Sequence, residues 1–104
     1  MVLQDLDVKY EEIESFCRHW DVVELAIFGS ALGEDFRSES DVDLLISFRD
    51  TSRWRLFDLV RMEEELELIF RRDVDLVEKE AVQNSENYIR RARILNNTHV
   101  IFRA

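Results

Sequence analysis

The chain has 104 residues, of which 46% are hydrophobic and 36% charged, as expected for a single globular domain spanning residues 1–104 with no room for a second module. Its 23 acidic and 14 basic residues give a net charge of −9, which argues against direct binding of nucleic acid, because phosphate backbones require clustered Lys and Arg. No apolar run has the length of a membrane span and the N-terminus does not resemble a signal peptide, so we expect a cytoplasmic protein without membrane contact.

The first predicted element is an amphipathic helix over residues 8–20, and a short buried strand over residues 22–28 follows it. Apolar side chains recur along one face of this helix, at Tyr10, Ile13, Phe16, Cys17 and Trp20. The only cysteine, Cys17, has no neighbour at metal-ligand spacing, so we expect it to pack in the core.

The predicted strand ends at Gly29-Ser30, and a brief helix is expected over residues 30–33. The free N–H groups and the positive dipole end of such a helix suit a polyphosphate. Gly29 allows the backbone to approach a phosphate closely because it has no side chain. A polar loop follows over residues 34–40, in which Arg37 either contacts a phosphate or pairs with a neighbouring carboxylate.

A second strand is predicted over residues 42–48 because apolar and polar residues alternate there. Asp41 and Asp43 stand two residues apart at its start. They therefore project from one face, about 6 to 7 Å apart along the strand. Two such carboxylates form a pair of oxygen ligands suited to Mg²⁺.

The second half of the chain predicts two more helices and two more strands. Ser52 is expected to cap a long helix whose apolar face is formed by Leu56, Leu59, Met62, Leu66 and Ile69. A third strand is expected over residues 72–78, with Asp73 and Asp75 on one face. Ser85 is expected to cap a last helix that ends near Asn96, before a fourth strand over residues 100–102.

Other polar residues of the chain are interpreted as solvated or structural. This interpretation covers Glu63, Glu64, Glu65 and Glu67, the arginines Arg71, Arg72, Arg90, Arg91 and Arg93, and the histidines His19 and His99. The resulting order of helices and strands, αβαβαβαβ, predicts an α/β or α+β domain of two layers.

Three runs, FGSALGEDFRSESDVDLLISF, LFDLVRMEEELELIFRRDVDLVEKEAV and YIRRARILNNTHVIF, resemble the minimal nucleotidyltransferases (MNT) of the DNA polymerase beta superfamily. The superfamily signature is Gly-Ser, a spacer, Asp-x-Asp and a third carboxylate on a later strand. The resemblance implies a small mixed sheet with helices packed mainly on one face. One departure is Gly33, where related sequences often carry arginine, so a phosphate contact from that position is not expected.

The resemblance also implies a site that transfers a nucleotide with the help of two divalent ions. Asp41, Asp43 and a third carboxylate would hold two Mg²⁺ ions, with Mn²⁺ as a substitute. The family pattern Val-Asp-Leu falls on Val74-Asp75-Leu76, so Asp75 is the preferred third carboxylate and Asp73 the lesser candidate. Gly29 and Ser30 would bind the nucleotide, which the resemblance suggests is ATP.

Many MNT proteins are antitoxins of HEPN-domain ribonucleases and transfer AMP from ATP to a tyrosine of the toxin. We therefore expect a protein adenylyltransferase antitoxin, whose partner is a HEPN toxin. A homo-oligomer and a hetero-oligomer with the toxin are both left open. One alternative is an antitoxin that only forms a stoichiometric complex. Another is a dimeric nucleotidyltransferase of small molecules, of the aminoglycoside-modifying kind.

Overall fold

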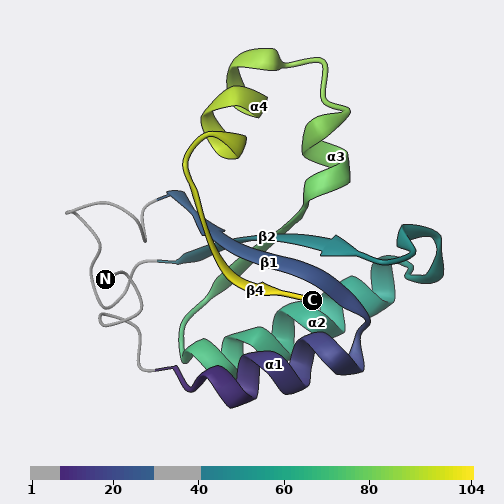
Figure 1. Cartoon of the computed structure of the whole chain (residues 1–104), viewed down its shortest axis with the longest axis vertical. Helices are drawn as coiled ribbons and strands as arrows, with labels where there is room; N and C mark the ends of the chain where they lie inside the picture. Colours follow the sequence, from purple (N-terminus) through teal and green to yellow (C-terminus); the bar gives the residue numbers. More distant parts are fainter. Residues whose placement is uncertain (1–7, 30–40) are drawn as a thin grey trace.

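A computed structural model describes residues 8–29 and 41–104, with only the backbone described at Thr51. The elements are α1 (Tyr10–His19), β1 (Val22–Phe28), β2 (Val42–Phe48), the 3-10 turn η3 (Thr51–Arg53), α2 (Leu56–Phe70), β3 (Val74–Glu78), α3 (Lys79–Gln83), α4 (Tyr88–Leu95) and β4 (Thr98–Arg103) (Figure 1). None of the helices in the described ranges combines the length and apolar character needed to cross a membrane.

The four strands form one mixed sheet in the order β3-β2-β1-β4. β1 pairs with β2 and β4 in antiparallel fashion, and β2 pairs with β3 in parallel. The parallel pair is joined through α2, as a parallel connection requires a crossover. The predicted α/β fold with a small mixed sheet is confirmed.

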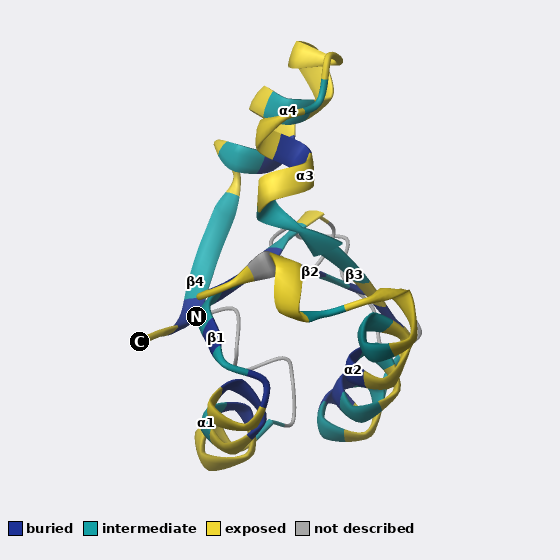
Figure 2. Ribbon diagram, turned by 90° about the vertical axis from the view of Figure 1, so that its right-hand side faces the viewer, coloured by how far each residue is buried: buried dark blue, intermediate teal, exposed yellow. Residues whose placement is uncertain are grey.

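The main core lies between one face of the sheet and the two longest helices, α1 and α2 (Figure 2). In β2 alternate residues point to this face, so Val42, Leu44, Ile46 and Phe48 all join the core. The buried members from the helices are Ile13, Phe16, Cys17, Met62, Leu66 and Phe70. Cys17 is fully buried, as predicted, and burial raises the pKa of its thiol to about 12.

A smaller apolar cluster occupies the opposite face of the sheet, beneath α3 and α4. It joins Ala26 of β1 and Leu45 of β2 to Val82 of α3 and Ile94 of α4. Figure 1 shows α3 and α4 on one side of the sheet and α1 and α2 on the other. The sheet therefore separates a large helical layer from a small one.

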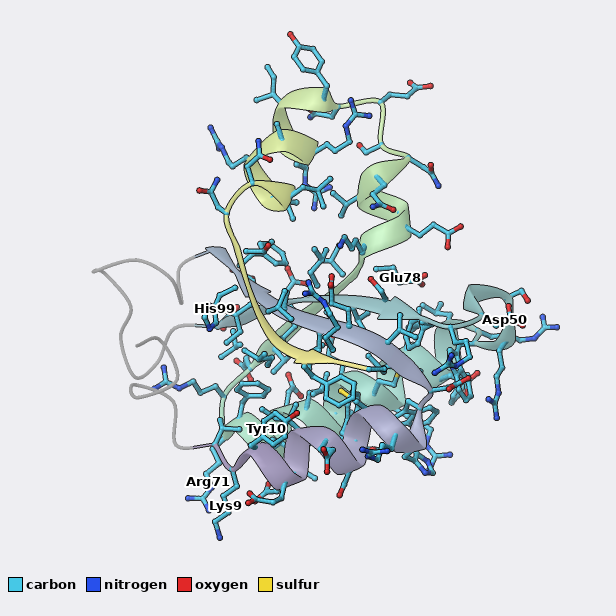
Figure 3. The ribbon with its side chains drawn as sticks, in the orientation of Figure 1. Lys9, Tyr10, Asp50, Arg71, Glu78 and His99 are labelled. Carbon is cyan, nitrogen blue, oxygen red and sulfur yellow. The ribbon has the colours of Figure 1, made fainter. Side chains whose placement is uncertain are left out.

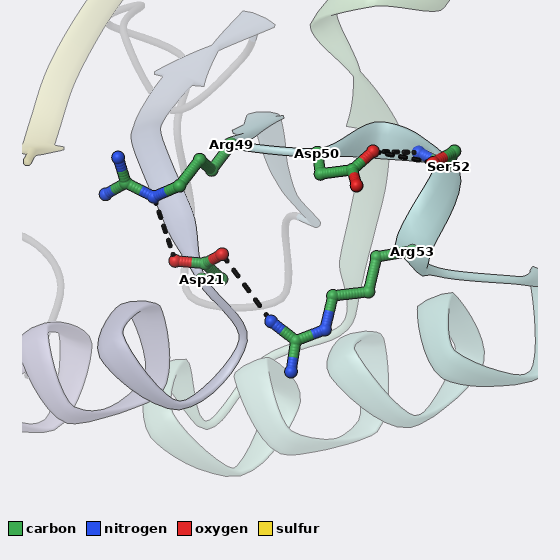
Figure 4. A network of polar contacts seen from close by, with 5 residues as sticks. All are labelled: Asp21, Arg49, Asp50, Ser52 and Arg53. Carbon is green, nitrogen blue, oxygen red and sulfur yellow. Dashed lines mark hydrogen bonds and ion pairs between the residues drawn. The ribbon is translucent and has the colours of Figure 1, made fainter.

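Polar contacts fix how the elements meet. The Trp20 indole N–H donates to Glu65 Oε1 at 3.0 Å, which links the end of α1 to α2. Asp21 accepts from Arg49 Nε at 3.2 Å and forms an ion pair with Arg53 at 3.5 Å (Figure 4). This network joins the turn before β1 to the segment after β2. It therefore stabilises the end of the antiparallel pair at which Val22 lies opposite Phe48.

Three sequence predictions at the helix starts are wrong. Ser52 does not cap the long helix; its backbone N–H and hydroxyl donate to Asp50 Oδ1 within the separate turn η3. The helix α2 begins at Leu56, whose side chain is 78% exposed and does not join the apolar face. Asn87, not Ser85, caps α4, since its side chain accepts from the Arg90 backbone N–H at 3.1 Å.

Candidate active site

Two of the predicted carboxylates lie side by side on the parallel strands. Asp43 of β2 and Asp75 of β3 are direct register partners. Neighbouring strands lie about 4.8 Å apart, so both carboxylates project from one face at that spacing. Because Val42 and Leu44 enter the main core, Asp43 points to the opposite face, the one that α4 covers in part.

Asp41 and Asp73 lie just outside the strands. Asp41 precedes β2 and is exposed. Asp73 precedes β3, where its backbone carbonyl accepts from the Val42 N–H at 2.9 Å. Asp73 therefore joins the start of the two strands through its backbone, whereas Asp75 lies within β3 beside Asp43.

Gly29 is in close contact with the Asp43 carboxylate. Its φ of +76° lies in the left-handed region, which side chains rarely adopt. A Cβ at this position would lie 3.1 Å from Asp43 Cγ and would overlap Asp43 Oδ2. Because Gly29 has no side chain, the end of β1 can lie directly against the Asp43 carboxylate.

The other half of the predicted phosphate site lies outside the described residues. This applies to Ser30, to Arg37, to Gly33, and to the predicted brief helix and loop between β1 and β2.

The described carboxylates fit a hard divalent cation by chemistry, because carboxylate oxygens are the ligands that Mg²⁺ prefers. Within residues 8–29 and 41–104, no group of three or more His, Cys, Asp or Glu side chains is arranged to hold a metal ion. Asp43 and Asp75 are adjacent in register, whereas the structure does not gather Asp41 with them.

A groove of about 540 Å³ opens beside Asp75, between α4 and the sheet. It is lined by Phe28, Asp75, Asn87, Ile89, Arg90, Arg93 and Ile94. Figure 3 shows Glu78, at the foot of α3, and His99, near the start of β4. Since Phe28 directly precedes Gly29, the groove reaches from the end of β1 to Asp75.

A second groove of about 540 Å³ lies on the other side of the sheet, between α1 and α2. Its charged side chains include Glu11, Glu12 and Glu65 and no Lys or Arg. A polyphosphate would meet like charges there, whereas the α4 groove presents two guanidinium groups. Of these two grooves, charge and the presence of Asp75 favour the α4 groove as the place for a polyphosphate.

The groove residues of α4 are not among the site residues that the sequence predicts. The sequence favours solvated positions for Arg90 and Arg93, and both are exposed, but both also line the groove that contains Asp75. The one available signal was that residues 88–95 contain three arginines and no acid in a strongly acidic chain. His19 is exposed and stacks edge-on against Trp20 at 4.9 Å, which agrees with its predicted structural role.

Comparisons with known proteins identify relatives of this chain. The sequence model of the family described as "Nucleotidyltransferase domain" matches residues 10–97. A protein of Methanocaldococcus jannaschii, provisionally named a protein adenylyltransferase, is 32% identical over 90 residues, which cover 86% of this chain and 89% of that protein.

Solved structures share the fold. A chain of a toxin–antitoxin crystal structure with AMP-PNP superimposes with a TM-score of 0.70 at 16% identity, covering 93% of this chain and 75% of that one. A chain from the complex of the tri-AMPylated HEPN toxin of Shewanella oneidensis with its MNT antitoxin gives a TM-score of 0.63 at 15% identity, covering 100% of this chain and 74% of that one. At these identities the likeness establishes the fold.

Proposed function

The chain belongs to the nucleotidyltransferase domain family, and on that premise we propose that it transfers AMP from ATP to a tyrosine of a HEPN-domain toxin and so silences the toxin. The observation that carries the proposal is the placement of Asp43 beside Asp75, with Gly29 packed against the Asp43 carboxylate. The relative named a protein adenylyltransferase and the neighbouring complex with an AMPylated HEPN toxin support this choice of acceptor.

In the proposed reaction, the tyrosine oxygen forms a bond to the α phosphorus of ATP, the bond to the bridging oxygen breaks, and diphosphate leaves. Asp75 accepts the proton of the tyrosine hydroxyl, since it is exposed and directly beside Asp43. Asp41, Asp43 and Asp75 are the residues that would hold Mg²⁺, which when bound offsets the charge that develops on the attacking and leaving oxygens.

The exposed surface of α2 supports a protein as the acceptor of AMP. One face of this helix carries Leu56, Phe57, Val60 and Leu68, with exposed fractions of 78%, 83%, 48% and 79%. Exposed apolar side chains gathered on one helix face indicate a protein contact. Because Glu11, Glu12 and Glu65 line the groove beside Leu68, we propose that a basic surface of the toxin docks there.

A second candidate function is a non-catalytic antitoxin that blocks its toxin by forming a complex. The observation that favours it is that the described residues gather no group of three metal-binding side chains. The two candidates differ in one respect that can be measured, namely whether the toxin carries AMP after contact with the chain.

The experiment is to incubate the chain with ATP, Mg²⁺ and its paired HEPN protein, then to separate the two proteins and weigh the partner by mass spectrometry. We expect AMP on a partner tyrosine, no modification in EDTA, and none with the Asp41→Asn, Asp43→Asn double variant. We expect this variant to remain folded, because removing two neighbouring charges relieves their repulsion. An unmodified partner that the double variant still neutralises would establish the non-catalytic function instead.

A further inference from the structure

Helix α4 is the most basic element of an acidic chain. Its sequence, YIRRARIL, contains Arg90, Arg91 and Arg93 and no acid, while the whole chain has a net charge of −9. A surface helix of an acidic protein usually mixes both signs of charge, so the composition of α4 calls for a physical reason.

The three arginines of α4 differ in what they contact. Arg91 Nη1 donates to the Ser85 carbonyl at 3.1 Å, so this side chain stabilises the segment before the helix. Arg90 and Arg93 line the α4 groove, and neither guanidinium forms a hydrogen bond or an ion pair with another residue of the described part of the chain. Two guanidinium groups are therefore available to a ligand in the groove.

The position of α4 places these groups next to the proposed reaction centre. Ile94 is buried against Ala26 and Leu45, which fixes α4 over the carboxylate face of the sheet. The groove holds Arg90 and Arg93 together with Asp75 and with Phe28, the residue before Gly29. A ligand that extends from the glycine turn toward Asp75 passes beneath α4.

From this geometry we propose that Arg90 and Arg93 bind the phosphates of the nucleotide. The proposal rests on the proposed function, because it assumes that the nucleotide lies at the carboxylate face. Arginine presents a planar set of donors that matches phosphate oxygens, and hydrogen bonds between charged groups are stronger than neutral ones. The two arginines offset the repulsion between a polyphosphate and the carboxylates Asp43 and Asp75.

The test compares nucleotide binding by the wild type and by an Arg90→Gln, Arg93→Gln variant. The matched control is Arg18→Gln, Arg61→Gln, which removes the same charge from α1 and α2, on the other side of the sheet. Calorimetry in Mg²⁺ measures the affinities for ATP, for ADP and for adenosine, and thermal denaturation verifies that each variant is folded.

We expect the α4 variant to bind ATP about tenfold or more weakly, since each lost hydrogen bond between charged groups contributes on the order of 1 kcal/mol or more. Its affinity for adenosine should match that of the wild type, and the control should bind all three ligands as the wild type does. An Arg90→Lys, Arg93→Lys variant should recover part of the ATP affinity, because it restores the charge.

Three results would overturn the inference: equal ATP affinity in the α4 variant and the control, a loss for adenosine as large as that for ATP, or a wild type that binds no ATP. The first two leave the proposed function intact if the wild type still transfers AMP. Conversely, the wild type could bind ATP through the two arginines and yet leave no AMP on the partner. That result would support the phosphate site and contradict the proposed transfer.

Discussion

Gly29 determines how closely β1 can approach the site carboxylates. Its left-handed backbone and its contact with Asp43 both exclude a side chain. We expect Gly29→Ala to lower the free energy of unfolding by about 1–3 kcal/mol, from the backbone penalty together with displacement of Asp43. Urea denaturation measures this change.

An Asp43→Ala substitution provides the control, because it removes the side chain that the new methyl group would meet. The loss caused by Gly29→Ala should be smaller in the Asp43→Ala background, and a double-mutant cycle gives the difference. Equal losses in both backgrounds would show that Asp43 is not the obstacle, and an unchanged stability would show that Gly29 is not required.

Individual site residues were predictable to the extent that they lie on regular strands. The alternation of apolar residues over 42–48 places Asp43 on the face opposite the core, and the structure confirms that strand with the same bounds. The pairing of Asp43 with Asp75 joins two strands that are distant in the sequence, so local patterns do not predict it. The family pattern Val-Asp-Leu is what indicated Asp75 as the partner carboxylate. Ser30 and Arg37 lie outside the described residues, so their roles stay predictions.

At the scale of the elements, Glu24 joins β1 to its neighbours. Its carboxylate accepts from Lys79 Nζ of α3 and from Arg103 Nη2 of β4, both at 2.8 Å. The hydrogen bond from Lys79, and with it that from Arg103, lowers the pKa of Glu24 below its ordinary value of 4.5. Since the folded-state pKa is lower than the unfolded one, Glu24 stabilises the fold above the unfolded pKa, and this stability is lost as the pH falls through the folded pKa.

We therefore expect Glu24→Gln to reduce the free energy of unfolding at pH 7 by about 1–2 kcal/mol, a value that allows for solvent screening of the exposed Arg103. The difference from the wild type should shrink as the pH falls below about 4.5, where the carboxyl of the unfolded chain takes up a proton before that of the folded chain. Denaturation curves at several pH values measure it.

The control is Glu14→Gln, because Glu14 forms an exposed pair with Arg18 at 3.6 Å within α1. Its effect should stay within about 0.5 kcal/mol at every pH. A Glu24 effect of the same size, or one that grows on acidification, would contradict the role assigned to these contacts.

Helix boundaries were less predictable than strands, because local polar contacts decide them. Serine is a common N-cap residue, but the Ser52 hydroxyl donates to Asp50 within the turn η3, and α2 begins only at Leu56. The five-residue helix α3 is too short to show a helical period. The α4 groove was not predictable, since it depends on α4 packing over the opposite face of the sheet.

For the whole molecule, the sheet separates two surfaces of opposite character. The α1–α2 side has an acidic groove and exposed apolar residues, and the α4 side has arginines beside the carboxylates.

We expect a Leu56→Ala, Phe57→Ala variant to bind the HEPN partner about tenfold or more weakly, because both side chains are almost fully exposed and free to contact it. ATP affinity and thermal stability should not change. The control is Tyr88→Ala on α4, which is 66% exposed, does not line the α4 groove, and should leave partner binding intact. Unchanged partner binding in the α2 variant would place the docking surface elsewhere.

Catalytic transfer by this chain predicts turnover at a large excess of the HEPN partner. With ATP and Mg²⁺, a trace amount of the chain should modify nearly all of the partner with AMP, and the partner should remain inactive as a ribonuclease after the chain is removed. If inhibition instead saturates at one chain per partner, disappears on separation and leaves no AMP on the partner, the chain does not act by catalytic transfer.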